Sequence, residues 1–221
     1  MNVSHRDPLP PRTASSWCSL AALLSAVLAT VALDLFTPGP GPLVQPLSAF
    51  ALTALGRYWL WIVEVAALGV GCVAVTVYQR GAARRFVVTL AVGCVGLAVS
   101  GLVATDPWFP WEHAPTPSGW LHIGAVLTTL GALGAGMVLR VHALPERWRV
   151  ARDRWIERAF GGTSFAALLY LVALRLRGQP LLWFGLWERT LLILMIAWCA
   201  SLALGPLSAR EHAERPMGRA G

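Results

Sequence analysis

The sequence contains no lysine, and charged residues of every kind are scarce. Only 13% of the 221 residues are charged, whereas 56% are hydrophobic. A typical soluble domain carries about 25% charged residues, so this composition excludes an ordinary water-soluble fold. The apolar residues gather in long runs and leave no separate stretch that could form an aqueous core. We therefore expect a single all-α domain embedded in a membrane.

The lack of lysine also bears on the meaning of the positive charge. All 18 basic residues are arginines, and the net charge is +7. Exclusive use of arginine is typical of a coding bias. These arginines stand at the ends of apolar runs, where they orient helices and contact anionic lipid head groups. Membrane lipids are therefore the expected partners, and the charge does not indicate binding to nucleic acid.

Paired cysteine motifs are absent as well. The chain has four cysteines, none in a CxxC pair and all inside apolar runs: Cys18, Cys72, Cys94 and Cys199. Such cysteines behave as small buried hydrophobic residues. They indicate nothing about the redox compartment.

Six apolar runs approach the length of a membrane-spanning helix, which is about 20 residues. They cover residues 17–36, 58–78, 86–105, 120–141, 159–174 and 181–205. The first run is longer than the apolar part of a cleaved signal peptide, about 7 to 15 residues, so we expect a retained anchor. The sequence thus predicts a six-helix bundle over residues 17–205, with tails at residues 1–16 and 206–221.

The arginines also predict the orientation of the bundle, since positive residues near span ends remain in the cytoplasm. Most of them lie in the two tails and in the connections after the second and fourth spans. The other side holds only Arg57, Arg175, Arg177 and, depending on where the last span begins, Arg189. Both termini are therefore expected in the cytoplasm. The connection over residues 106–122, which carries no arginine, is expected to face outward.

Ionisable residues within the spans gather toward the predicted outer side, and such residues mark candidate functional sites. The candidate ligand-binding residues are Asp34, Glu64, Asp106, His122, Glu188 and Arg189. By helical rise, Glu64 lies about 9 Å and Arg189 about 12 Å below the predicted starts of their spans. We therefore expect Arg189 to pair with Glu64, while Asp34 and Asp106 are the other candidates. Such a pair either fixes the register of two helices or forms part of an anion or head-group site.

Four residues in and beside the outer connection carry atoms that a divalent metal could use. They are Asp106, Glu112, His113 and His122. Their spacing fits no compact metal motif, and a hydrogen bond between helices is the favoured role for His122. Haem is not favoured either, because His122 and His142 lie on one span about 30 Å apart. We expect no cofactor.

Small residues recur at helical spacing in the third and fourth spans. They are Gly93, Gly96, Ser100 and Gly101 in the third and Gly124, Gly131, Gly134 and Gly136 in the fourth. Such residues allow helix backbones to approach closely. His122, Thr129 and Gly136 recur every seventh residue, which predicts a stripe that faces the interior of the bundle. Close packing and a narrow ligand cavity both fit this stripe.

Four short motifs resemble those of a known family. ATDP closes the third span, SGWLH opens the fourth, GLWERT lies early in the last, and PLSAFAL precedes the second. In order and spacing they resemble the six-span bacterial membrane proteins catalogued as domain of unknown function 998. Those proteins commonly carry Phe-Pro-Thr-Asp where this chain has residues 103–106. The resemblance implies six helices and the bacterial cytoplasmic membrane, but no established activity. It leaves Asp106, His122, Glu188 and Arg189 as the matched polar positions.

Three functions fit this sequence. The first is a non-enzymatic membrane protein with an outward-facing polar pocket that binds, and could move, a small or lipid-like molecule. Asp106 and His122 would lie at its mouth, and a pair of Arg189 with Glu64 would form its floor. The second is a membrane-embedded enzyme acting on lipid or prenyl groups, in which Asp106 and His122 serve as acid and base or as metal ligands. The third is a structural subunit with a membrane-protein partner.

Overall fold

The structure is a computed structural model that describes most of the predicted membrane domain. The described residues are 13–36, 47–53, 56–103, 105–107, 113–143, 155, 158–163, 166, 169–170, 173 and 184–205. Every element assigned within them is helical. Much of the fifth predicted span, residues 159–174, lies outside the described residues.

Five long helices and one 3-10 helix form the described part of the fold. They are α1 (Ala14–Phe36), η1 (Leu47–Leu52), α2 (Gly56–Gln79), α3 (Arg84–Leu102), α4 (Pro117–Ala143) and α6 (Phe184–Leu204). Each long helix contains a stretch that is long and apolar enough to cross a membrane. The chain is therefore an all-α polytopic membrane protein, as the sequence predicts.

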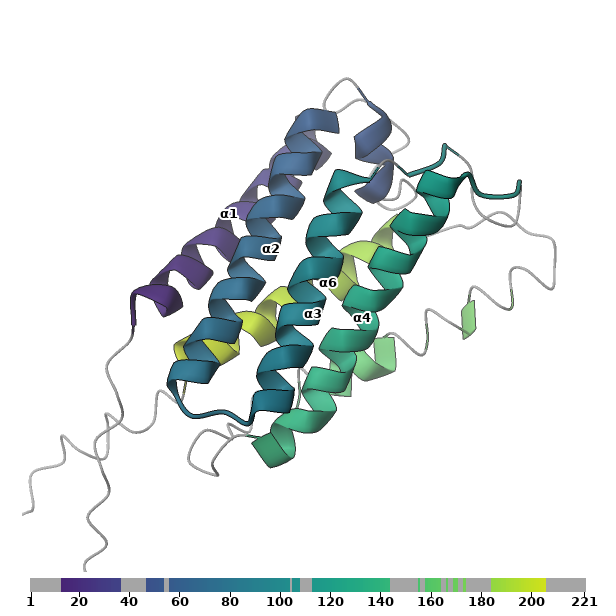
Figure 1. Cartoon of the computed structure of the whole chain (residues 1–221). Coiled ribbons are helices and arrows are strands. Elements are labelled where there is room, and N and C mark those ends of the chain that lie inside the picture. Colours follow the sequence, from purple (N-terminus) through teal and green to yellow (C-terminus); the bar gives the residue numbers. More distant parts are fainter. Residues whose placement is uncertain are drawn as a thin grey trace, which may run out of the picture.

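Helices that follow one another in the chain pack side by side. In Figure 1, α1, α2, α3 and α4 form a row, and α6 runs behind them in contact with α1 and α2. The two ends of the bundle differ. The η1 end holds η1 itself, the last residues of α1 and α3 and the first residues of α2, α4 and α6. The opposite end, called the arginine end, holds Arg80, Arg84, Arg85 and Arg140.

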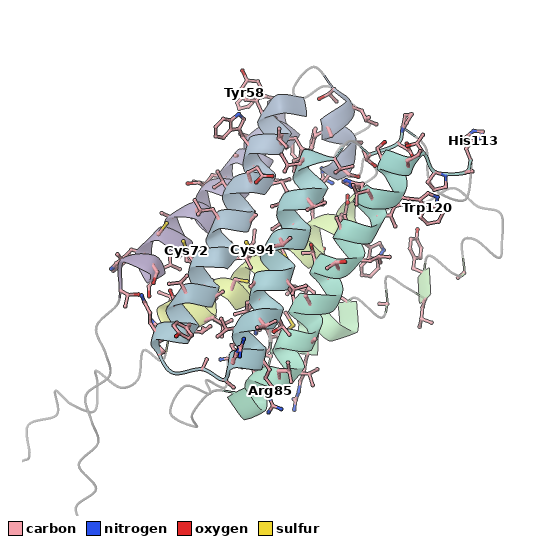
Figure 2. All side chains as sticks on the ribbon, viewed as in Figure 1. Tyr58, Cys72, Arg85, Cys94, His113 and Trp120 are labelled. Atoms are coloured by element: carbon pink, nitrogen blue, oxygen red, sulfur yellow. The ribbon has the colours of Figure 1, made fainter. Side chains whose placement is uncertain are left out.

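Apolar side chains fill the interior and also cover the outside of the bundle. Phe86 and Trp198 are fully buried, and their rings meet edge to face with centroids 6.4 Å apart, a favoured arrangement for aromatic pairs. On the outside, Tyr58 and Trp120 are exposed. Figure 2 shows both at the η1 end, whereas Arg85 lies at the arginine end. Aromatic rings at span ends and an apolar exterior suit a bundle surrounded by lipid.

At the arginine end, Arg80, the residue after the last residue of α2, joins three helices. Its guanidinium donates hydrogen bonds to the carbonyl oxygens of Leu202 at 2.6 Å and Ala203 at 2.9 Å. It also donates to the hydroxyl of Ser16 at 3.3 Å. The last carbonyls of a helix have no partner within that helix, and a cation near them is favoured by the helix dipole. Arg80 therefore caps the end of α6 and ties it to the start of α1.

The helix ends differ from the predicted spans by a few residues. α1 begins at Ala14 rather than residue 17, and α4 at Pro117 rather than 120. Hydropathy locates the apolar centre of a span, whereas the ends depend on local capping. The residues just before Phe184 of α6 lie outside the described part of the chain.

The predicted inward stripe of α4 is confirmed. His122 and Thr129 are buried, and a Cβ built on Gly136 would lie 3.2 Å from the ring of Trp198. The expected close packing is not found for Gly124, Gly131 and Gly134 within the part of the chain that the structure describes. A Cβ built at any of these three would meet no described atom within 4 Å.

The cysteines are less uniformly buried than the sequence indicates. Cys199 is buried, while Cys72 and Cys94 are half-buried. The expectation is wrong for Cys18, which is exposed at the edge of the contact between α1 and α2. Its sulfur lies 3.4 Å from that of Cys72 on α2.

Candidate functional site

A cavity of about 150 Å³ lies inside the bundle and extends from the η1 end toward its middle. All five long helices and η1 contribute to its wall. Most lining side chains are apolar, among them Trp59, Leu97 and Met195. The polar lining residues are Thr30, Ser48, Ser100, His122, Thr129 and Glu188. The cavity thus brings together two of the candidate residues, His122 of α4 and Glu188 of α6.

His122 is held by the end of α3. Its Nδ1 lies 3.1 Å from the carbonyl oxygen of Val103, which is the C-cap of that helix. A carbonyl oxygen can only accept a hydrogen bond, so Nδ1 carries the proton and Nε2 of the neutral ring carries a lone pair. The hydrogen bond predicted for His122 is present. Nε2 has no partner among the described residues.

Glu188 lies in the second turn of α6 and holds η1 in place. Its Oε2 accepts a hydrogen bond from the backbone N–H of Leu47, the first residue of η1. The first N–H groups of a helix lack partners within the helix, so a carboxylate is a favourable acceptor there. Oε1 receives no hydrogen bond from the described part of the chain.

Arg189 pairs with Asp34 of α1, the alternative candidate, and not with Glu64. Its Nε donates to Asp34 Oδ2 at 2.8 Å and its Nη2 donates to Asp34 Oδ1, so the pair is bidentate. Nη1 donates to the carbonyl oxygen of Gly185 at 3.0 Å. The expected pairing with Glu64 is wrong, because α6 lies against α1 as well as α2 and the guanidinium meets the Asp34 carboxylate of α1. The bidentate pair joins the end of α1 to the start of α6.

Glu64 lies between α2 and α3. A Cβ built on Gly101 of α3 would lie 3.1 Å from its Oε1. That oxygen is buried and has no hydrogen-bond partner among the described residues, although an unpaired buried polar atom is costly. Glu64 belongs neither to the ion pair nor to the lining of the cavity. The predicted floor made of Glu64 and Arg189 is therefore wrong.

Asp106 closes the connection between α3 and α4. Its Oδ2 accepts from the Thr116 N–H at 3.0 Å, and its Oδ1 accepts from the Thr116 hydroxyl at 2.6 Å. That hydroxyl also accepts from the Gly119 N–H at 3.1 Å, so Thr116 is the N-cap of α4 and Pro117 its first residue. A Cβ at position 119 would lie 1.9 Å from Asp106 Oδ2, so any other residue there would displace this carboxylate from Thr116. Asp106 thus holds the start of α4 and does not line the cavity.

Three of the four weak metal candidates, Asp106, His113 and His122, are described, and they are not brought together. Among these, no three His, Cys, Asp or Glu side chains are grouped so that they could hold a metal ion. Asp106 is engaged by Thr116, and His122 turns inward. Figure 2 shows His113 on the connection, away from the helices. Glu112 lies outside the described residues.

The chain matches the model of a protein family. The family model described as "Protein of unknown function (DUF998)" matches residues 20–205. The chain belongs to this family. No curated protein and no solved structure matches it. The match spans α1 to α6 of this DUF998 protein and therefore includes the whole cavity.

Some cavity residues of the DUF998 chain were missed by reasoning from the sequence. Thr30, Ser48 and Trp59 line the cavity but were not among the candidates. Thr30 and Trp59 lie within apolar runs, where one hydroxyl or one aromatic ring carries no distinctive signal. Ser48 lies in the PLSAFAL motif. That motif was the available signal, because it forms η1 and contacts the cavity.

Proposed function

We propose that this membrane protein binds a small, mostly apolar molecule in the cavity at the η1 end. The supporting observation is that His122 and Glu188 each bring one uncommitted polar atom to an otherwise largely apolar wall. Ligand sites are usually apolar hollows with a few well-placed polar groups. Ionisable residues inside membrane helices are also functional candidates by default.

The volume of the cavity limits the size of the ligand. A dry protein cavity of about 150 Å³ accommodates a molecule as large as benzene, and this cavity has about the same volume. A complete lipid is much larger. The lipid-like ligand expected from the sequence would therefore enter only with the end of a chain, whereas a small molecule would fit whole.

The location and orientation of the protein are part of the proposal. The distribution of the arginines favours a cytoplasmic arginine end and an outward η1 end, in the bacterial cytoplasmic membrane. A ligand would then reach the cavity from outside the cell or from the outer leaflet. A membrane-protein partner remains compatible with this arrangement.

The described contacts favour binding over acid–base catalysis by Asp106 and His122. General acid–base catalysis needs both groups within reach of the reacting atoms. His122 lines the cavity, but both carboxylate oxygens of Asp106 accept hydrogen bonds from Thr116. No described contact favours the enzyme hypothesis over the binding hypothesis.

Cavity filling provides the test. Val126 lines the cavity, so Val126→Phe should occupy part of its volume. We expect toluene to raise the unfolding temperature of the wild-type protein in nanodiscs, and Val126→Phe to abolish this rise. Val138→Phe is the matched control, since Val138 is on the same helix but is 72% exposed. The proposal is wrong if toluene does not stabilise the wild type, or if both variants respond alike.

A further inference from the structure

The polar groups around the cavity are mostly of one kind, because most of them can only accept hydrogen bonds. Thr30, Ser100 and Thr129 donate their hydroxyl protons to carbonyl oxygens of their own helices, at 2.8, 2.7 and 2.9 Å. A hydroxyl used in this way offers only its lone pairs to a ligand. Ser48, the remaining hydroxyl of the described lining, can donate or accept.

The two ionisable lining residues have the same character. His122 uses its Nδ1 proton on the carbonyl oxygen of Val103, which leaves the lone pair of Nε2. Glu188 has one oxygen on the N–H of Leu47 and, in its ionised form, offers the other as an acceptor. The neighbouring cation, Arg189, binds Asp34 and does not line the cavity. The described wall therefore contains a carboxylate but no cationic side chain.

We infer that the ligand of this cavity is a small organic ammonium compound with an apolar body. Its N–H groups would donate to Glu188 and His122, and its charge would balance the Glu188 carboxylate. The ring of Trp59 also lines the cavity, and aromatic faces attract cations. The Trp59 N–H and the Ser48 hydroxyl can donate, but an anionic head group or a carbonyl compound would bring its acceptors against a wall made mostly of acceptors. Buried polar groups without partners oppose binding.

This inference rests on the proposed function, because it assigns a ligand class to the same cavity. It corrects the anion or head-group site considered for Arg189, since that guanidinium is already bound to a carboxylate. The small volume adds a second restriction, because a compound with a body of only a few carbon atoms fits.

The test compares probes of equal size and different hydrogen-bonding character. n-Butylamine, n-butanol and n-butyrate are titrated into the purified full-length protein in phosphatidylcholine nanodiscs at about pH 7, where an alkylamine carries a proton as lysine does. Toluene serves as the purely apolar probe. Binding is measured by calorimetry. We expect butylammonium to bind at least about tenfold more tightly than butanol, and butyrate not to bind.

Glu188→Gln is the informative variant. The amide oxygen of glutamine can still accept from the Leu47 N–H, so η1 should remain in place while the charge is lost. We expect the affinity for butylammonium to fall at least about tenfold. Glu64→Gln is the matched control, since Glu64 is also an acidic residue within a helix but does not line the cavity. The affinity of this variant for butylammonium should be unchanged. If Glu188→Gln does not fold, Val126→Phe replaces it, and it should abolish binding of the amine.

The outcomes separate the two proposals. If toluene binds but butylammonium binds no more tightly than butanol, the ammonium inference is overturned while the proposed function stands. Equal loss of amine binding in Glu188→Gln and Glu64→Gln would also overturn the inference. If no probe binds at all, both proposals fail.

Discussion

At the scale of single residues, the ion pair of Asp34 and Arg189 is sensitive to the loss of either charge. Two charges taken from water into a membrane are costly unless each meets its partner. The bidentate geometry uses both oxygens of Asp34, and Gly185 supplies a further acceptor for Arg189. The pair therefore stabilises the contact of α1 with α6 only while both charges are present.

Removal of one charge should cost more than removal of both. Arg189→Gln is expected to lower the free energy of unfolding by on the order of 2 kcal/mol, less than for a fully buried pair, because the side chains retain 12% and 16% exposure. The double variant Asp34→Asn/Arg189→Gln should recover part of this loss. Unfolding by SDS measures both. A double variant less stable than Arg189→Gln would contradict the role of charge pairing.

The close contact of α3 with α4 leads to a second prediction at the residue scale. A Cβ on Gly96 of α3 would lie 2.7 Å from Thr129 Oγ1 and 3.0 Å from the Ala125 carbonyl oxygen of α4. Gly96→Ala should therefore destabilise the bundle by about 1–3 kcal/mol, as overpacking does. Gly131→Ala is the control, because a Cβ there meets no atom of the described residues within 4 Å. Equal unfolding free energies for the two variants would show that α3 and α4 do not approach this closely.

At the scale of elements, the start of α4 depends on the hydroxyl of Thr116. This hydroxyl accepts from the Gly119 N–H and donates to Asp106. Thr116→Ala should cost about 1 kcal/mol, as the loss of an N-cap does, and should speed hydrogen exchange of the amides of residues 118–121. Thr116→Ser keeps the hydroxyl and should exchange like the wild type. Unchanged exchange in Thr116→Ala would rule out the capping role.

The elements also show what could be predicted from the sequence. Hydropathy located the five described spans, because a membrane helix must be apolar along about 20 residues. The partner of Arg189 could not be derived from depth alone. Depth is a coordinate along the helix, whereas pairing also depends on which helix lies beside α6.

The cavity illustrates the same limit. The spacing of His122 and Thr129 predicted that one side of α4 faces inward, because residues seven apart share a helix face. Glu188 was recognised as an ionisable residue within a span. That these residues line one cavity depends on how several helices pack together. Such packing is not encoded in the period of any single helix.

At the scale of the whole molecule, orientation is the property most directly open to experiment. His113→Cys lies on the connection at the η1 end, and Ala82→Cys lies on the turn at the arginine end. We expect a membrane-impermeant maleimide to label His113→Cys in intact cells and Ala82→Cys only after lysis, because arginine-rich ends stay inside. The wild type is the control for its own four cysteines. The reverse pattern of labelling would invert the proposed topology.

The contacts of Arg80 have a consequence for the order in which the chain is assembled. Its two carbonyl acceptors belong to Leu202 and Ala203, at the very end of the last helix. A ribosome synthesises α2 long before α6. The guanidinium of Arg80 therefore lacks these acceptors at the stage when α1 to α4 are already inserted. A nascent chain that stops before α6 would leave this cation without them at the membrane surface. Completion of synthesis and completion of packing are thereby linked at the arginine end.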